Sequence, residues 1–281
     1  MTTRLSGGVL ERLAALPMGT GQLAASWLGQ SGFAIRHVDT TILVDPFLAP
    51  YQGRLYDAAL TPDAAQGISA VLCSHEHLDH FDAISAPAIA AASPGAVFVV
   101  PTPIVDMVTE VGIAPDRVIG LQPGEATDIG GLTVRGVPAM HGVTPDDAYG
   151  FGEAISQGLV RFLGYAIEAG GVRIYHAGDT IAFDGMAEQL RALGVEVALL
   201  PINGRDPERE ALGIVGNLDH REAAQLASEI GVDLLIPMHH DLFAGNRGHP
   251  SQLIEIAERE YPNVPIFLPV RNRPFLLSGR P

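Results

Sequence analysis

Four side chains of the kinds that bind metal ions are crowded into six residues of this sequence. His75, His77, Asp79 and His80 follow a short apolar run at residues 70–73. Imidazole and carboxylate groups are suitable ligands for zinc, manganese or iron. If the run is a strand, its end releases these side chains into a loop, where they can turn toward one point. Because a short backbone cannot easily aim all four at one ion, we expect His75 and His77 to serve one metal ion. Asp79 and His80 are then expected to serve a neighbouring ion.

Three more candidate positions lie just after strand-like apolar runs farther along the chain. They are His141 after residues 132–138, Asp179 after residues 172–176, and the pair His239 and His240 after residues 232–237. A lone histidine or aspartate at a strand end is often only a turn or capping residue. Three such positions in one chain instead indicate a metal centre whose ligands come from distant segments.

The elements that must position these residues alternate between strand and helix. Short apolar runs predict strands at residues 41–45, 69–73, 96–100, 132–138, 163–168, 172–176, 195–201, 232–237 and 265–269. Helical patterns predict four helices. The first begins near Thr102, the second ends at Gly194, the third begins after Asp219 and the fourth spans residues 250–260. This alternation predicts a layered α/β fold. We expect a single domain over residues 1–281, with two αβ halves at about 20–140 and 141–281.

Composition limits the partners that such a protein can have. The 281 residues include 17 basic and 32 acidic side chains, for a net charge of −15, which argues against nucleic acid or an anionic membrane as partner. Cys73 is the only cysteine, so the chain forms no intrachain disulfide. The N-terminus lacks the pattern of a signal peptide, and prolines interrupt the most apolar window, residues 86–100. We therefore expect a soluble cytoplasmic protein with no membrane partner, and we expect it to form a homo-oligomer.

These motifs resemble those of the metallo-β-lactamase superfamily, whose motif His-x-His-x-Asp-His matches His75 to His80. The resemblance extends over residues 27–275 and implies a four-layered αβ/βα sandwich with the metal site at one edge of two sheets. It implies one metal ion on His75, His77 and His141, a second ion on Asp79, His80 and His239, and Asp179 between them. His239 is preferred to His240 because the first histidine of the terminal motif is the usual ligand in similar proteins.

Three further segments narrow the resemblance to the L-ascorbate-6-phosphate lactonase group. They are residues 27–33, residues 201–205 and residues 236–241. The group suggests a lactone, including a phosphorylated sugar lactone, as a candidate substrate, so we expect a small and anionic substrate.

The implied chemistry is hydrolysis at two divalent ions, with zinc or manganese preferred and iron also suitable. Water bridging the two ions would become hydroxide near neutral pH and attack a carbonyl or phosphorus centre. Asp79 is expected to be a metal ligand and also a proton acceptor. His240 is the best-placed candidate for the proton donor, although a supporting or surface position is equally compatible with the sequence.

Other polar residues have two interpretations each. Asp45 could orient a ligand imidazole through its second nitrogen, or form a turn before Pro46. Asn203 and Arg205 could bind an anionic substrate, or Arg205 could form a salt bridge with Asp206 or Glu208. The weakly patterned residues 143–161 could close over the substrate through Tyr149 and Phe151, or these rings could pack the loop down.

Three other functions compete with lactone hydrolysis. A phosphodiesterase acting on a small nucleotide or phospholipid-like substrate would use the same ligands. A diiron oxidoreductase on this fold has glutamate where this chain has His77, which disfavours that alternative. A non-catalytic metal-binding protein would not need a complete ligand set at several strand ends.

Overall fold

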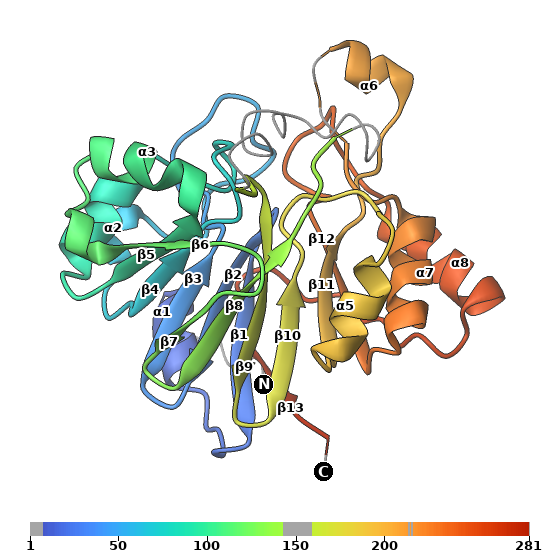
Figure 1. The fold of residues 1–281 in the computed structure, drawn as a ribbon, viewed down its shortest axis with the longest axis horizontal. Helices are drawn as coiled ribbons and strands as arrows, with labels where there is room; N and C mark the ends of the chain where they lie inside the picture. The colour runs from blue at the N-terminus through green and yellow to red at the C-terminus, as the bar shows by residue number, and fades with distance from the viewer. Residues whose placement is uncertain (1–7, 143–158, 213, 215, 281) are drawn as a thin grey trace, which may run out of the picture.

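Two β-sheets packed face to face, with helices on both outer faces, form the centre of this computed structural model (Figure 1). The structure describes residues 8–142, 159–212, 214 and 216–280. The four layers of helices, sheet, sheet and helices confirm the sandwich expected from the sequence.

The first sheet has seven strands in the order β13-β1-β2-β3-β4-β5-β6. Its strands are β1 (Gln22–Gly29), β2 (Gly32–His37), β3 (Thr40–Val44), β4 (Ala70–Leu72), β5 (Val97–Pro101), β6 (Val118–Leu121) and β13 (Phe275–Ser278). The strands from β13 to β3 pair antiparallel, and those from β3 to β6 pair parallel. The parallel half therefore directs the carboxyl ends of β3 and β4 to the same edge.

The second sheet has six strands in the order β12-β11-β10-β9-β8-β7. They are β7 (Ala126–Ile129), β8 (Leu132–Pro138), β9 (Leu163–Ala169), β10 (Val172–His176), β11 (Val197–Pro201) and β12 (Leu234–Met238). The strands from β10 to β12 pair parallel, and those from β7 to β10 pair antiparallel. Each sheet thus combines a hairpin half with a parallel half.

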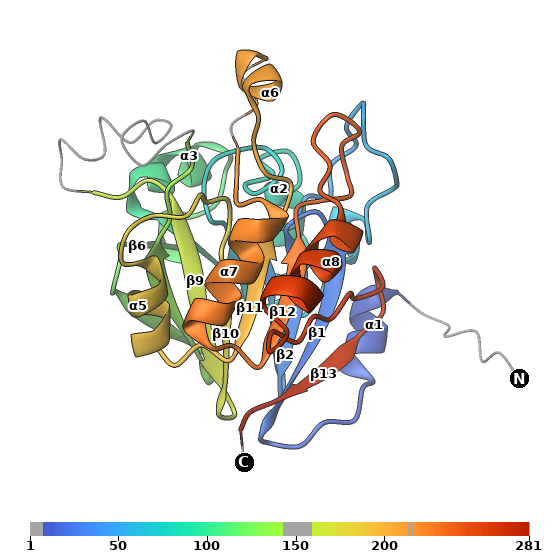
Figure 2. The ribbon, with the colours of Figure 1, turned by 90° about the vertical axis from the view of Figure 1, so that its right-hand side faces the viewer.

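Helices cover the outer face of each sheet (Figure 2). The first sheet carries α1 (Val9–Ala14), α2 (Ala86–Ala92) and α3 (Val105–Glu110), and the second carries α5 (Met186–Ala192), α7 (His220–Ile230) and α8 (Pro250–Glu260). The short α6 (Pro207–Ala211) projects beyond the sheets, and 3₁₀ turns occur at Pro62–Ala64, Thr102–Ile104 and Pro115–Arg117. Within the described part of the chain, every helix is too short or too polar to cross a membrane.

Apart from Gln22 and Ser26, β1 carries apolar residues or glycine on both of its faces. Leu23, Ala25 and Trp27 belong to the core that includes the second sheet, whereas Ala24 and Leu28 pack with the helices of the first sheet. Because both faces of the strand are covered, residues of both parities must be apolar. The Tyr165 hydroxyl of β9 donates to the carbonyl oxygen of Cys73, 2.8 Å away, and so links the two sheets beside the ligand loop.

Several expectations about elements are confirmed and others need correction. Asp219 caps α7, accepting hydrogen bonds from the backbone of residues 221 and 222, and α8 spans residues 250–260 as expected. The strand expected at residues 265–269 is wrong. Only a single bridge joins Ile266 to Leu235, because Pro265 and Pro269 have no N–H to donate to a strand ladder.

The division between the two halves also differs from the expected position near residue 140. β7 and β8 lie before that residue but already belong to the second sheet, and β13 returns to pair with β1 of the first. The two ends of the chain therefore share the first sheet.

Candidate metal centre

The predicted ligands gather at one edge of the two sheets, where strands from both sheets end. His75, His77, Asp79 and His80 follow β4, while His141, Asp179 and His239 follow β8, β10 and β12. Four segments from different parts of the sequence are therefore brought to one place by the strand ends, as expected.

Close packing between two of these loops depends on Gly178. Its φ of +59° is in the left-handed region, and a Cβ there would lie 2.6 Å from the Cβ of Ser74. Glycine thus lets Asp179 and the loop after β4 approach one another.

Three groups of ligand atoms lie close enough to hold metal ions. The groups are His75 with His77 and His141, His75 with His80 and Asp179, and Asp79 with His80 and His239. Within each group all ligand atoms lie within 4.8 Å of one another. The first and third groups have the same members as the two ligand sets that the resemblance implied.

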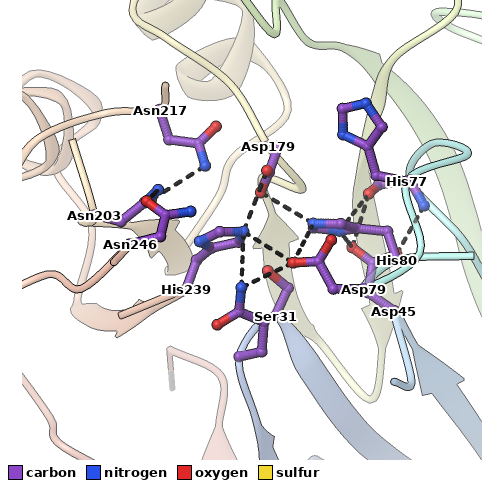
Figure 3. A network of polar contacts seen from close by, with 12 residues as sticks. Ser31, Asp45, His77, Asp79, His80, Asp179, Asn203, Asn217, His239 and Asn246 are labelled. Carbon is purple, nitrogen blue, oxygen red and sulfur yellow. Dashed lines mark hydrogen bonds and ion pairs between the residues drawn. The ribbon is translucent and has the colours of Figure 1, made fainter. Parts of the chain in front are cut away.

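Asp179 connects the groups (Figure 3). Its Oδ1 lies 3.3 Å from His80 Nε2, and its Oδ2 lies 3.3 Å from His239 Nε2 and 3.6 Å from His141 Nε2. One carboxylate therefore faces histidines of both ligand sets. This is the geometry that a bridging ligand needs.

Buried polar atoms in this cluster fit a metal ion. His80 Nε2 and Asp179 Oδ1 are buried, and neither has a hydrogen-bond partner among the residues that the structure describes. Their 3.3 Å separation brings a nitrogen and an oxygen donor together without satisfying either as a hydrogen bond. Since buried polar atoms almost always find a partner, a shared cation is the simplest one for this pair. Nitrogen and oxygen donors of this kind suit zinc, manganese or iron.

The two ligand sets differ in their electrostatics. Burial would lower the pKa of His239, but the carboxylates of Asp179 and Asp79 outweigh it and raise the pKa to about 9. The pKa of His80 is raised well above its usual value by the same carboxylates and Asp45, again against the effect of burial. The carboxylate-rich side of the cluster thus favours positive charge.

Histidines of the other set are neutral near pH 7. Burial and neighbouring histidines lower the pKa of His141 to about 4, against the attraction of Asp179. Burial and neighbouring histidines also place the pKa of His75 well below its usual value. Neutral imidazoles are the form that binds metals, so this set needs no deprotonation before it binds an ion.

Asp45 lies where the orienting interpretation places it. Its Oδ2 is 2.7 Å from His80 Nδ1, and its two oxygens accept hydrogen bonds from the backbone N–H and the hydroxyl of Ser74. Since a carboxylate accepts hydrogen bonds, this contact fixes a proton on His80 Nδ1 and leaves Nε2, beside Asp179, as the nitrogen that would bind a metal ion after losing its own proton. The residue has a positive φ of 44°, in the turn after β3, so both interpretations of Asp45 apply.

The sequence reasoning did not single out Gln30, which touches the cluster. Its side-chain Nε2 lies 2.8 Å from Asp79 Oδ2 and 3.0 Å from His239 Nε2, and its backbone oxygen accepts from the N–H of His239. Gln30 is almost fully buried in the turn between β1 and β2. Its place in the segment 27–33, which carried part of the family resemblance, was the available signal.

His240, by contrast, belongs to none of the three ligand groups. Its ring packs against Trp27 with centroids 5.1 Å apart, and burial lowers its pKa to about 4. A histidine that is neutral at pH 7 lacks the acidic second proton of an imidazolium, which a general acid would donate. The structure therefore gives no support to His240 as the proton donor.

Asn203 and Arg205 also lie away from the ligands. Arg205 makes two hydrogen bonds to the carboxylate of Glu222, at 2.7 and 2.6 Å, rather than the salt bridge with Asp206 or Glu208 considered from the sequence. The side chain of Asn203 bonds to Asn246 and Asn217, in a group beyond His239 (Figure 3). Both residues line a separate cavity from the one at the ligands. Tyr149 and Phe151, in the expected loop at residues 143–161, lie outside the described residues.

A cavity of about 470 Å³ opens onto the ligands. Five predicted ligands and Asn246 form its polar side, and aromatic and aliphatic residues with Gly245 form the rest of its wall; the five ligands are His77, Asp79, His141, Asp179 and His239. A small molecule in this cavity would lie against the predicted metal ligands.

The fold and the ligand geometry define a candidate metal centre, and comparison with known proteins places the chain in a family. The β-lactamase superfamily domain matches residues 40–240 of the chain. The chain belongs to the β-lactamase superfamily.

Two relatives and one solved structure illustrate the similarity. The chain is 31% identical to a UPF0173 metal-dependent hydrolase of Rubrobacter xylanophilus over 240 residues, which cover 83% of this chain and 87% of the relative. It is 25% identical to the "probable L-ascorbate-6-phosphate lactonase UlaG" of Salmonella choleraesuis over 200 residues, or 69% of this chain and 55% of that protein. The chain thus spans little more than half of the lactonase.

The structure of Igni18, a metallo hydrolase of Ignicoccus hospitalis, is similar in fold. It superposes with a TM-score of 0.68 at 20% sequence identity, and the match covers 92% of this chain and 100% of the Igni18 chain.

Proposed function

We propose that this protein is a hydrolase with two divalent metal ions that opens a small lactone or a related ester. The observation that carries the proposal is the position of Asp179, which faces His80, His141 and His239 from between two ligand sets. Zinc or manganese are the preferred ions, and iron is also compatible with these ligands. The similarity to a lactonase and to a metal-dependent hydrolase supports hydrolysis of an ester bond.

When bound, divalent ions would lower the pKa of a water molecule and stabilise negative charge that develops on the substrate. Asp79 would serve chiefly as a ligand. Its Oδ2 is already engaged by Gln30 and His239, which hold the carboxylate in place. Burial raises the pKa of Asp79, but His80 and His239 lower it by more. The pKa therefore lies below its usual value and the carboxylate remains ionised.

Three groups keep the ligands oriented. Asp45 holds the tautomer of His80, Gln30 connects Asp79 with His239, and the Gly178 turn brings Asp179 up to them. Pre-oriented ligands bind an ion in the required geometry without reorganising during the reaction.

A panel of substrates on metal-loaded protein tests the proposal. It contains simple lactones, aryl esters and the phosphodiester bis(4-nitrophenyl) phosphate, each assayed with zinc, manganese and iron. We expect turnover of lactones or esters that is lost on chelation and restored by the metal. Turnover of the phosphodiester without any lactone or ester turnover would favour the phosphodiesterase alternative and contradict the proposal.

A further inference from the structure

Three aromatic rings line the cavity that opens onto the metal ligands. Phe47, Tyr51 and Phe243 all line the cavity, and their ring centroids lie 5.9 to 6.3 Å from one another. Two chain segments supply these rings, and the backbone N–H of Leu55 joins them through a hydrogen bond to Leu242. Leu78 and Ile214 extend the apolar wall.

Phe47 is the buried anchor of this aromatic wall, which we define as Phe47, Tyr51 and Phe243. Phe47 is 6% exposed, and the guanidinium of Arg54 lies 4.5 Å from its ring centroid. Arg54 in turn donates hydrogen bonds to the backbone oxygens of Phe47 and Ala49. An apolar surface beside the metal ligands is suited to selecting the non-reacting part of a substrate.

Apart from the histidines of the ligand cluster, no cationic side chain lines the cavity among the residues that the structure describes. The chain contains no lysine, so arginine is the only residue that could supply a permanent positive charge. Arg205 is paired with Glu222 in the separate cavity, and Arg161 is paired with Glu76. Residues 143–158, which lie outside the description, contain acidic residues and no arginine. Arg54 lies beside Phe47, but it donates to backbone oxygens and lines a different cavity. An anionic group placed against the cavity side of the aromatic wall would therefore lose water without gaining a partner.

We propose that the substrate is an uncharged lactone or ester with an aromatic or branched alkyl group, which the aromatic wall selects. The inference rests on the proposed hydrolase function and departs from the phosphorylated sugar lactone that the resemblance suggested. The net charge of −15 acts in the same direction, because it disfavours the approach of anions. Hydrolysis breaks the acyl carbon–oxygen bond, adds the hydroxyl of water to the acyl carbon and transfers a proton to the departing alkoxide. The products are an alcohol and a carboxylic acid, which releases its proton to water to become a carboxylate.

Three lactones that differ in charge or in the presence of an aromatic group test the inference on the metal-loaded protein. The neutral probe is dihydrocoumarin, the charged probe is its 6-carboxylate, and γ-butyrolactone lacks the aromatic group. We expect kcat/KM for dihydrocoumarin to exceed that for the 6-carboxylate by about 100-fold, because the carboxylate would lie unpaired against the wall. Equal or higher kcat/KM for the charged lactone would overturn the inference and leave the hydrolase assignment intact.

Variants of the wall provide the second arm. Phe243→Ala and, at a half-exposed position that tolerates change, Tyr51→Ala are each expected to raise KM for dihydrocoumarin about 10-fold. The KM for γ-butyrolactone should remain within about twofold of wild type. Phe267→Ala is the matched control, because this ring contacts Phe275 and does not line the cavity. An unchanged KM for dihydrocoumarin in both wall variants would contradict selection by these rings.

Binding separates failure of the inference from failure of the function. The neutral lactam 3,4-dihydroquinolin-2-one resembles dihydrocoumarin but resists hydrolysis, and its binding can be measured by calorimetry. Binding that Phe243→Ala weakens about 10-fold, without turnover of any ester, would support the wall and refute the hydrolase. Turnover of lactones without lactam binding would refute the wall alone.

Discussion

Asp45→Asn is expected to weaken metal binding by about 10- to 100-fold, although Asp45 belongs to none of the three ligand groups. The buried carboxylate accepts hydrogen bonds from Ser74 and from His80 Nδ1 at 2.7 to 2.8 Å. Asparagine offers one acceptor oxygen and places an NH₂ group toward two donors. To avoid facing donor with donor, His80 would move its proton to Nε2, the atom that points toward Asp179.

The expected loss corresponds to about 1.4 to 2.8 kcal/mol of binding free energy. The folded protein should lose a comparable amount, about 1 to 3 kcal/mol, because one buried donor is left without an acceptor. Competition with a chelator of known affinity measures the zinc dissociation constants, and urea unfolding of the metal-free protein measures stability. One ion per chain should bind more weakly, whereas the affinity of the His75, His77 and His141 set should change about twofold or less.

Asp82→Asn is the matched control. Asp82 is also a buried carboxylate, but it accepts hydrogen bonds from the backbone N–H groups of Leu48, Ala49 and Ser85. Its replacement should lower the free energy of unfolding and leave zinc affinity of the folded protein unchanged. Equal zinc affinities in wild type and Asp45→Asn would refute the orienting role, as would an equal loss in Asp82→Asn.

Three further changes probe the surroundings of the ligands. Gln30→Leu removes the donor at 2.8 Å from Asp79 Oδ2 and should weaken zinc binding about 10-fold in the same competition assay. An unchanged zinc affinity would contradict a role of Gln30 in orienting the ligands. The pKa of His240 falls from 6.5 unfolded to about 4 folded, so metal-free stability should fall as pH drops through this window. In His240→Gln, the fall in the free energy of unfolding between these pH values, measured by urea unfolding, should be smaller by up to about 3 kcal/mol. Identical pH profiles of stability in the variant and the wild type would contradict a buried neutral ring. Gly178→Ala, at φ +59° with its Cβ 2.6 Å from that of Ser74, should cost about 2 kcal/mol or more in urea unfolding, and a neutral effect would contradict the close packing.

The ligand cluster could be predicted because its signal is local to each segment. His141, Asp179 and His239 each follow a buried apolar strand, and parallel strands direct their carboxyl ends to the same edge. The apolar runs that formed these strands were also visible, since both faces of each sheet are covered. The layered α/β class and the candidate ligands therefore follow from strand-length patterns, whereas the four-layered sandwich and the division of the ligands into two sets came from the family resemblance.

The orientation of polar side chains depends on contacts that a sequence pattern does not contain. Arg205 turns to Glu222, 17 residues away, because α7 packs beside its loop. Gln30 meets Asp79 and His239 only because the β1–β2 turn lies beside the ends of β4 and β12. These pairings depend on the packing of the two sheets against each other.

Five strands of the structure were not predicted, namely β1, β2, β6, β7 and β13. For β7 and β13 the reason is physical. β7 exposes alternate residues, and β13 is a short strand at the edge of the first sheet, so neither forms a continuous apolar run. Their pairing comes from neighbouring strands rather than from strong patterns of their own.

Metal stoichiometry tests the central claim most directly. Wild-type protein and His77→Ala are loaded with zinc, dialysed and measured by elemental analysis, with circular dichroism to confirm that both are folded. Two ligand sets that share Asp179 predict about two zinc ions per wild-type chain and about one in His77→Ala, which lacks a ligand of only one set. A folded wild-type protein that retains no zinc, or an unchanged two ions in His77→Ala, would contradict the dinuclear centre.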